Sequence, residues 1–482
     1  MARSRDAEAY ERTLRELYAR AARGIDPGLA RMERALALAG RPERAFDVIH
    51  VAGTNGKGSV SHAVWAGLGV PAGLFTSPHL HRLTERFRVR APEPSPSSTA
   101  ARGEAAERDV VEAWASLRPI LDAPGAPPLT FFETVTLLAL RLFERRGVSI
   151  AVLETGLGGR LDSTNVVAAP LFCAITRIGL DHQVFLGEDL ASIAAEKAGI
   201  LKPGVPCVVS PQRPEAMAVI EARAAAVGAP LIPVRAAGPS GPGRAEDGAT
   251  GDRAIVGRGE PVARDGRGAA RRGADPVWIS RDAEGRAVIR RGRRTLVDRD
   301  GVLAAPHRCE NAAVAAAVLW ALEARGVPVD VPRGVLEARW AGRLERVTPP
   351  GGPAHLLDAA HNPDAARALA GVLARADERP RVLLFGAMAD KDWPAMLDAL
   401  RPVVEAIVFS RSPLPRAEDP HVLSARAGDR PAEAVVDVDE AMARAAARAG
   451  PDGLVVVAGS LFLMAEVRAR LLGLASDPPI AM

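Results

Sequence analysis

A short apolar segment that leads directly into a glycine-rich turn is the feature that most constrains the fold of this chain. Residues 46–52 (FDVIHVA) are mostly apolar and rich in β-branched side chains, which indicates a buried strand. The turn GTNGKGS follows over residues 53–59, and a helical pattern runs from about Ser59 to Gly67. A strand, a glycine turn and a helix in this order are typical of the start of an α/β domain with a parallel sheet.

The same alternation continues along the 482 residues, which exceed the usual size of a single core. In the first part of the chain the patterns predict strands at 150–153, 171–176 and 206–209, and helices at 131–145 and 190–198. A second series begins at about residue 341, with strands near 355–357, 382–385, 406–409 and 454–457. We therefore expect two α/β domains: a larger P-loop-containing parallel-sheet domain over residues 1–340 and a smaller Rossmann-like domain over residues 341–482.

Two segments lack apolar periodicity and are rich in Gly, Pro, Ala and charged residues, at about 235–276 and 91–107. We expect both to be loose surface insertions, because they cannot bury much surface.

The composition narrows the cellular role. The chain is 48% hydrophobic and 25% charged, as soluble globular proteins are. It has no apolar run long enough to span a membrane and no signal-peptide core near its N-terminus, so a cytoplasmic location is expected. Three widely separated cysteines suit buried thiols better than disulfides or a zinc site. A formal charge of only +4, with acidic and basic residues mixed, argues against a nucleic-acid partner.

Lysine and asparagine are scarce, although the chain has 62 basic residues. A sequence that uses arginine for nearly every positive charge is expected to keep lysine where a primary amine is needed. Chance survival of a few lysines is the alternative. The four lysines are Lys57, Lys197, Lys202 and Lys391, and the four asparagines are Asn55, Asn165, Asn311 and Asn362.

The glycine turn has the chemistry of a phosphate-binding loop. Glycines let backbone N–H groups approach phosphate oxygens, a helix N-terminus adds partial positive charge, and a lysine reaches the terminal phosphates. The spacing departs from the usual P-loop pattern, because Gly58 separates the lysine from the serine. A generic glycine-rich turn is the alternative to nucleotide binding. The predicted ATP contacts in this turn are Thr54, Asn55, Gly56, Lys57, Gly58 and Ser59.

The turn resembles that of the Mur ligase superfamily, and specifically of folylpolyglutamate and dihydrofolate synthases. All four lysines and all four asparagines fall inside strings that match this family in order along most of the chain. Besides GTNGKGS, the strings are SPHL (77–80), TFFE (130–133), ETGLGGRLDSTN (154–165), LDH (180–182), EKAGILK (196–202), ENAAVA (310–315), GRLE (342–345), LDAAHNP (357–363) and DKD (390–392). The resemblance implies the Mur ligase architecture and an ATP-dependent amide ligase.

A magnesium site is part of this expectation, because phosphoryl transfer from ATP needs Mg²⁺ held by oxygen ligands. Glu154 closes an apolar strand, where a carboxylate is costly unless a cation is near. The resemblance implies that Ser77, Glu154 and His182 are the metal ligands, and P-loop chemistry adds Ser59 as a further one.

Lys197 matches a family lysine that CO₂ converts into a carbamate. Arginine does not form such an adduct readily, so its absence here favours this chemistry. A surface salt bridge to Glu196 or Glu188 is the alternative.

The remaining family contacts follow from the resemblance. Asn311, Arg343 and Asp358 match ATP contacts, whereas His361, Lys391 and Ser460 match second-domain motifs that address glutamate carboxylates or the acyl phosphate. Lys57, Lys197, His361 and Lys391 are thus the predicted catalytic set. The strings expected to contact the pterin end of the substrate supply Asp26, Pro27, Gly28, Leu29, Thr130, Phe131, Phe132, Glu133, Leu161, Asp162 and Ser163.

The implied reaction adds L-glutamate to dihydropteroate, to reduced folates or to both, through an acyl phosphate formed with ATP. Its partners are small molecules, and the family resemblance implies a monomer. Two alternatives stay open: another Mur-type ligase acting on a cell-wall or polyamide precursor, and a P-loop NTPase whose basic insertion binds nucleic acid.

Overall fold

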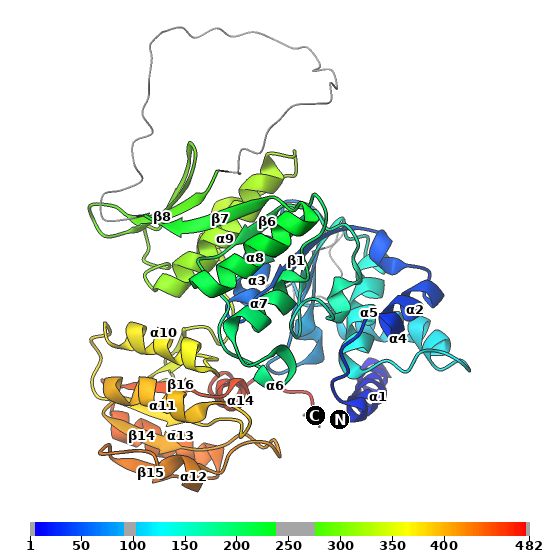
Figure 1. Ribbon diagram of the computed structural model, residues 1–482. Helices are drawn as coiled ribbons and strands as arrows, with labels where there is room; N and C mark the ends of the chain where they lie inside the picture. The colour runs from blue at the N-terminus through cyan, green and yellow to red at the C-terminus, as the bar shows by residue number, and fades with distance from the viewer. Residues whose placement is uncertain (1–4, 91–102, 238–274, 479–482) are drawn as a thin grey trace, which may run out of the picture.

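The computed structural model describes residues 5–90, 103–237 and 275–478 (Figure 1). Within these residues the strands form two separate sheets, one of ten strands and one of six. The order in the larger sheet is β10-β9-β8-β7-β6-β5-β1-β4-β2-β3. Its strands are β1 (Asp47–Ala52), β2 (Ala72–Phe75), β3 (Phe87–Arg90), β4 (Ile150–Glu154), β5 (Phe172–Ile175), β6 (Cys207–Val209), β7 (Leu231–Ala236), β8 (Val277–Arg281), β9 (Ala287–Arg291) and β10 (Arg294–Val297).

The centre of the larger sheet is parallel, and helices cover both of its faces. β1 pairs in parallel with β4 and with β5. Successive side chains of β1 point to opposite faces: Ile49 and Val51 pack with α3 (Lys57–Gly67) and α9 (Pro306–Glu323), whereas Val48 packs on the other side with α5 (Phe131–Arg145). The other helices of that second face are α1 (Arg5–Tyr18), α4 (Glu107–Leu121), α7 (Leu190–Ala198) and α8 (Pro214–Val227).

The smaller sheet has the order β11-β12-β16-β13-β14-β15 and is also mostly parallel. Its central strand β13 alternates between two helical layers: Leu383 and Phe385 pack with one cluster, and Val382 and Leu384 with the other. The strands are β11 (Glu345–Val347), β12 (Ala354–Leu357), β13 (Arg381–Phe385), β14 (Ala406–Phe409), β15 (Ala432–Ala434) and β16 (Leu454–Ala458). The helices on its two faces are α10 (Pro363–Leu373) and α11 (Trp393–Leu400), and α13 (Val438–Ala449) and α14 (Leu461–Leu472).

The predicted fold class is confirmed: two α/β units, the first with a large parallel-dominated sheet. The strands predicted from apolar runs all exist, and α7 has the predicted bounds. The short helix η5 (Arg333–Glu337) still packs in the core of the larger sheet, and the smaller sheet begins with β11 at Glu345, so we propose the domain boundary near residue 341. No helix among the described residues combines the length and the apolar character that a membrane crossing requires.

The predicted insertions need one correction. Residues 238–274 and 91–102 lie outside the described residues. Arg235 and Ala236 were expected in the first insertion, but they belong to β7 and pair with β8. The antiparallel edge β8-β9-β10 was not predicted either, because arginines interrupt its short apolar runs. Edge strands with one solvated face tolerate such charges.

Candidate active site

The glycine-rich turn lies between β1 and α3, where a central strand ends and a helix begins. Gly56 precedes the helix with a φ of 88°, and Gly53 has a φ of 146°. A Cβ at Gly56 would collide with the amide of Asn311, and one at Gly53 would collide with Thr176. Both positions therefore need glycine for conformation and for space.

The N–H groups of the turn divide into two sets. Those of Thr54 and Asn55 donate to the carbonyl oxygen of Arg177, at 3.0 and 3.1 Å. Those from Gly56 onward stand at the start of a helix, where intrahelical acceptors are lacking and the helix dipole favours an anion. Lys57 begins the helix, and its Nζ donates to the carbonyl oxygen of Thr54 at 3.3 Å. The turn thus offers backbone N–H groups and an ammonium group to phosphate oxygens.

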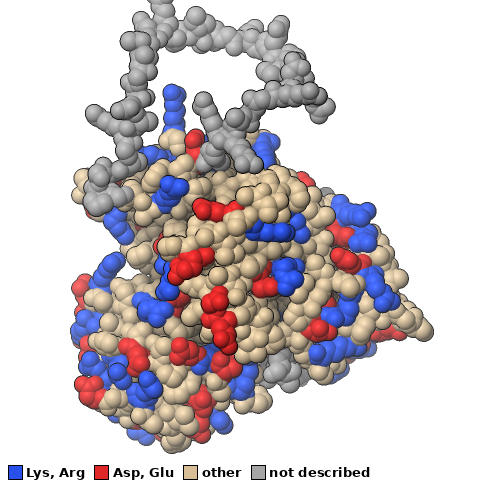
Figure 2. All heavy atoms as spheres, viewed as in Figure 1, with Lys and Arg blue, Asp and Glu red and all other residues tan. Residues whose placement is uncertain are grey.

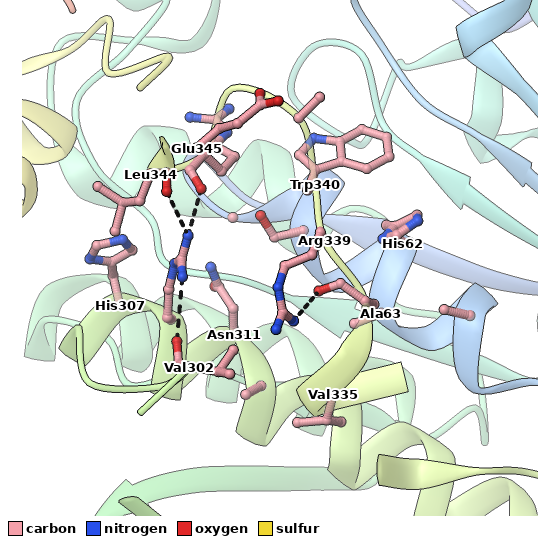
Figure 3. Close-up of a pocket in the computed structure, with 18 of the residues that line it drawn as sticks. His62, Ala63, Val302, His307, Asn311, Val335, Arg339, Trp340, Leu344 and Glu345 are labelled. Carbon is pink, nitrogen blue, oxygen red and sulfur yellow. Dashed lines mark hydrogen bonds between the residues drawn. The ribbon is translucent and has the colours of Figure 1, made fainter. Parts of the chain in front are cut away.

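A cavity of about 1580 Å³ opens beside the turn, between α3, α9 and the connection to the second domain. Figure 3 shows Trp340 and His62 on one side of it, His307 on the other and Asn311 between them. The predicted nucleotide contacts that line this cavity are Asn55, Gly56, Ser59, Asn311, Arg343 and Asp358. The cavity therefore joins residues of the turn to residues of the domain junction.

Trp340 is a member of this cavity that the sequence analysis missed. Its ring lies 5.0 Å from the ring of His62, and the guanidinium of Arg88 lies 5.0 Å from its centroid. Burial, together with the charges of Arg88 and Arg90, lowers the pKa of His62 to about 3, so this imidazole is neutral at pH 7. A tryptophan three residues before Arg343, inside the predicted junction, was the available signal. The two rings give one wall of the cavity an aromatic surface.

Two of the three predicted metal ligands, Ser77 and Glu154, lie together where the neighbouring strands β2 and β4 end. Glu154 ends β4, is 4% exposed, and its Oε2 accepts a hydrogen bond from the N–H of Ser77 at 3.2 Å. Burial raises the pKa of Glu154 to about 7, although the charge of Lys57 opposes this shift. Burial lowers the pKa of His182 to about 4, and repulsion by the charge of Lys57 contributes in the same direction.

Among the predicted metal ligands, Glu154 is the residue whose surroundings best suit a bound cation. A buried carboxylate with a raised pKa is stabilised by a nearby cation, and its oxygens are the ligands that Mg²⁺ prefers. Among the described residues there is no cluster of three or more His, Cys, Asp and Glu side chains placed to hold a metal ion. Protein groups alone therefore give an incomplete shell, which phosphate oxygens of a nucleotide can complete.

Lys197 lies in α7 and is 4% exposed. Burial, with the repulsion of Lys57, lowers the pKa of Lys197 to about 7, although Asp181 opposes the shift. The alternative of a surface salt bridge is wrong, because Lys197 forms no ion pair within the described chain and the Glu196 carboxylate pairs with Arg160 at 2.7 Å. Lys197 is thus a buried amine that loses its proton far more readily than a solvent-exposed lysine.

Asp181 connects the two domains, although no local sequence pattern predicts this role. Its side chain accepts from Nζ of Lys391 at 2.6 Å and from Nδ2 of Asn362 at 3.2 Å, and it lies 3.5 Å from Nε2 of His361. Burial alone would raise the pKa of Asp181, but hydrogen bonding to His361 and the charges of His361, His182 and Lys391 outweigh it and hold the pKa well below its usual range. The LDH string contains Asp181, but the family resemblance gives a role only to its histidine.

The glycine turn also touches the second domain directly. The side-chain amides of Asn55 and Asn362 exchange two hydrogen bonds, at 3.0 and 3.4 Å. Ser460 has a different place: it is 2% exposed and caps α14, where its hydroxyl accepts from the N–H groups of Phe462 and Leu463.

Comparison with known proteins places this arrangement in a family. Residues 342–461 match the family described as Mur ligase, glutamate ligase domain. Over 475 residues the chain is 30% identical to the dihydrofolate synthase/folylpolyglutamate synthase of Bacillus subtilis, which covers 96% of this chain and 99% of that protein. The chain belongs to the folylpolyglutamate synthase/dihydrofolate synthase family.

Two further matches show how far the family likeness extends. A probable bifunctional folylpolyglutamate synthase/dihydropteroate synthase of Haloferax volcanii is 35% identical over 462 residues, or 92% of this chain. The chain spans about half the length of that relative, whose matched part is 48% of it. The solved folylpolyglutamate synthase/dihydrofolate synthase of Yersinia pestis, complexed with AMPPNP and Mn ion, aligns with a TM-score of 0.73 and 30% identity, covering 93% of this chain and 94% of that one.

In this folylpolyglutamate synthase family member, an arginine joins two of the strings expected at the pterin end. Arg31 is the second residue of α2 (Ala30–Leu38). Its Nη1 lies 2.7 Å from Oδ2 of Asp26, and its Nε donates to the carboxylate of Glu133 at 3.2 Å. Glu133 also closes a capping box with Thr130 at the start of α5. The segment 26–29 is therefore tied to the start of α5, a link that sequence spacing did not reveal.

The expected substrate residues of this family member differ in how accessible they are. Phe131 is 5% exposed and packs in the core, whereas Phe132 is only partly buried, with its ring 5.9 Å from that of Phe75. Both carboxylate oxygens of Asp162 are engaged by its own loop, through the N–H groups of residues 156, 157 and 164. Any contact of Asp162 with a pterin has to share these bonds. Ser163 pairs with the hydroxyl of Thr136 at 2.8 Å.

Proposed function

We propose that this chain is an ATP-dependent acid–amino-acid ligase that adds L-glutamate to dihydropteroate, to reduced folates or to both, through an acyl phosphate. The observation that carries the proposal is a convergence of side chains at the carboxyl ends of the central strands of the larger sheet. The glycine turn, Glu154 and Lys197 come from the first domain, and Asp181 brings Lys391 and His361 of the second domain to the same place. The names of the matched relatives support the same substrates.

Activation of the substrate carboxylate is the first task, because free carboxylates do not acylate amines at useful rates. The turn and Lys57 hold the terminal phosphates, and Asn311, Arg343 and Asp358 line the cavity for the rest of the nucleotide. Ser77, Glu154 and His182, with Ser59, are the residues that would hold Mg²⁺. A bound Mg²⁺ supplies neutralisation of charge on the phosphates during transfer.

Lys197 supports this centre as a carbamate. The neutral amine attacks CO₂ and forms an N–C bond, the nitrogen releases one proton to the solvent, and the neutral side chain becomes an anion. The repulsion between Lys197 and Lys57 becomes an attraction, which explains why a lysine with a lowered pKa is kept beside another lysine. Arginine could not make this exchange.

The second domain receives the amino acid. Lys391 and His361 lie at the Asp181 carboxylate and offer positive charge to the carboxylates of glutamate or to the acyl phosphate. Contacts across the domain interface, such as Asn55 with Asn362, hold the second domain against the glycine turn and limit access of water to the mixed anhydride.

The test is ADP formation by the purified protein with Mg²⁺ and ATP. We expect rapid ADP release only when L-glutamate is combined with dihydropteroate or with tetrahydrofolate, and little with any component alone. Lys57→Ala should abolish the release. Release that depends on neither pteroate nor folate would refute the proposal.

A second assay separates the NTPase alternative. Figure 2 shows acidic and basic side chains interspersed on the visible face, as expected for a mixed surface. Deleting residues 240–270 should leave ligation intact, whereas a nucleic-acid function of that segment would be lost. A monomeric state, a cytoplasmic location and the lack of a nucleic-acid partner stay predictions.

A further inference from the structure

A loop of the first domain reaches the second domain directly after a predicted metal ligand. This loop, residues 76–82, joins β2 to the short helix η3 (Leu83–Arg86) and is called the Ser77 loop below. The N–H of Ser77 donates to the carboxylate of Glu154, and three residues later Leu80 packs against the hydrophobic cluster of α13, α14 and β16. One loop therefore carries a group of the expected cation site and a contact with the other domain.

Arg468 of α14 holds the Ser77 loop by a second contact. Its side chain is 4% exposed, and its Nη1 donates to Nε2 of His81 at 2.9 Å. Its Nε and Nη2 donate to the two carboxylate oxygens of Glu345 at 2.8 and 3.0 Å. Glu345 begins β11, the first strand after the domain boundary. A single buried guanidinium thus ties the Ser77 loop to the start of the second domain.

The chemistry of arginine fixes the direction of both contacts. A guanidinium carries N–H donors only, so Nε2 of His81 accepts and the ring proton stands on Nδ1. Nδ1 lies 3.4 Å from Oγ of Ser476, in the segment that follows α14. The bidentate pair with Glu345 has the geometry that suits the planar fork of arginine, whereas lysine offers only a point charge. Arg468 is therefore suited to holding its neighbours in one arrangement.

The segment after α14 adds a third contact with the Ser77 loop. Figure 1 shows this segment leaving the second unit towards α1. The N–H of Asp477 donates to the carbonyl oxygen of His81 at 2.7 Å, and its Oδ2 accepts from the N–H of Leu83 at 2.7 Å and from the hydroxyl of Tyr10 at 2.9 Å. The second domain thus holds the loop by its backbone as well as by its side chains.

These contacts lie at the cavity beside the glycine turn. Leu80, Glu345 and Arg468 all line it, and Figure 3 shows Glu345 among the lining residues. The proposed chemistry gives neither Glu345 nor Arg468 a ligand. Because Nε, Nη1 and Nη2 of Arg468 each donate to a protein atom, its guanidinium is better placed to position neighbouring residues than to bind a phosphate.

We propose that Arg468 is a positioning residue that couples the seating of the second domain on the first to the cation site at Ser77 and Glu154. The inference rests on the proposed function and adds a regulatory link to it. While the second domain is seated, Arg468 holds His81, and the loop keeps Ser77 against Glu154. Movement of the second domain away breaks these bonds together, so the residues that would hold Mg²⁺ are arranged for it only in the closed form.

The test compares how tightly the protein binds AMPPNP with Mn²⁺ and without it. Arg468→Met should weaken binding of the Mn²⁺ complex about tenfold and change binding of the metal-free analogue, measured in EDTA, by less than about twofold. Isothermal titration calorimetry gives both dissociation constants. Arg470→Met is the matched control from the same helix. Arg470 pairs with Asp439 and Glu466, both within the second domain, so the ratio of the two constants should stay at the wild-type value.

Asp477→Ala tests the same link if Arg468→Met does not fold, because Asp477 lies outside the helices and strands. It should shift the ratio in the same direction by about threefold, with an unchanged circular dichroism spectrum. An equal loss of both affinities, an unchanged ratio in the folded variants, or an equal shift in Arg470→Met would overturn the inference and leave the ligase assignment standing. Wild-type protein without folate- or pteroate-stimulated ADP release would instead refute the proposed function.

Discussion

Lys197 and Lys391 lie in different domains and both interact electrostatically with the carboxylate of Asp181, but their surroundings are opposite. Lys391 forms an ion pair with Asp181, with Nζ 2.6 Å from Oδ1. Lys197 has no ion pair in the described chain, and burial with the repulsion of Lys57 lowers its pKa to about 7. A buried lysine without an ion pair gives up its proton more readily, because burial disfavours the charged form.

The difference explains why lysine is kept at both positions of an arginine-rich chain. At 197 the chemistry needs an amine that can lose its proton, which arginine cannot supply. At 391 it needs a compact positive charge that reaches across the domain interface to Asp181. Arginine should therefore be tolerated better at 391 than at 197.

Lys197→Arg is expected to have the largest effect. The variant should fold normally but lose about a thousandfold in ligation rate, or about 4 kcal/mol of transition-state stabilisation, because the carbamate cannot form. ADP formation and circular dichroism measure the two properties. Lys202→Arg is the control, since within the described residues Lys202 forms no ion pair and donates to the backbone carbonyl of Asn165 at 3.3 Å. Near-normal turnover of Lys197→Arg would contradict the carbamate role.

Lys391→Met should lower the free energy of unfolding by about 3 kcal/mol, because it leaves the Asp181 carboxylate buried without its ammonium partner. Lys391→Arg keeps the charge and should cost less than about 1 kcal/mol. Urea denaturation monitored by circular dichroism compares them. Equal losses for the two variants would show that shape, and not charge, decides this contact.

The lowered pKa of Lys197 predicts a pH dependence of stability in CO₂-free buffer. An unfolded lysine keeps its proton up to about pH 10.4, whereas folded Lys197 releases it at about 7. Between these values the unfolded state binds more protons, so stability should rise with pH, by at most about 1.4 kcal/mol per unit from this group. Lys197→Met should remove this contribution from the unfolding free energies measured between pH 7.5 and 9.5. A slope that is the same in both proteins would contradict the lowered pKa.

The smallest expected effect is that of Glu154→Gln on how strongly a divalent cation stabilises the protein against unfolding. The pKa of folded Glu154 is raised to about 7, so the metal-free protein loses stability as pH rises from the unfolded value towards 7 and the buried carboxylate becomes charged. Mn²⁺ with a non-hydrolysable ATP analogue should therefore raise the free energy of unfolding more at pH 8 than at pH 6, by about 1 kcal/mol, which appears as a larger shift of the melting temperature at pH 8. This difference between the two pH values should vanish in Glu154→Gln, and its persistence there would place the cation elsewhere.

Much of the fold follows from the sequence because buried parallel strands are short apolar runs that need no information from distant residues. The runs at 150–153 and 406–409 are examples. The strands at the edges were harder. β8, β9 and β10 carry arginines on a solvated face, and only pairing with β7 makes them part of the sheet.

The candidate site divides in the same way. Glu154 could be predicted because it closes an apolar run. The glycine turn could be predicted because its glycines and lysine are close together in the sequence, between a strand and a helix. The role of Asp181 could not, because its partners Asn362 and Lys391 lie 181 and 210 residues away. Arg31 was missed for the same reason, since it joins Asp26 to Glu133 only after α2 packs near α5.

The most direct test of the account is ¹³C NMR of the protein in buffer that contains ¹³C-bicarbonate. The contrast between the two lysines predicts one carbamate resonance in the wild-type protein and in Lys391→Arg, and none in Lys197→Arg. An actively ligating wild-type protein without a carbamate signal, or a signal that survives in Lys197→Arg, would contradict it.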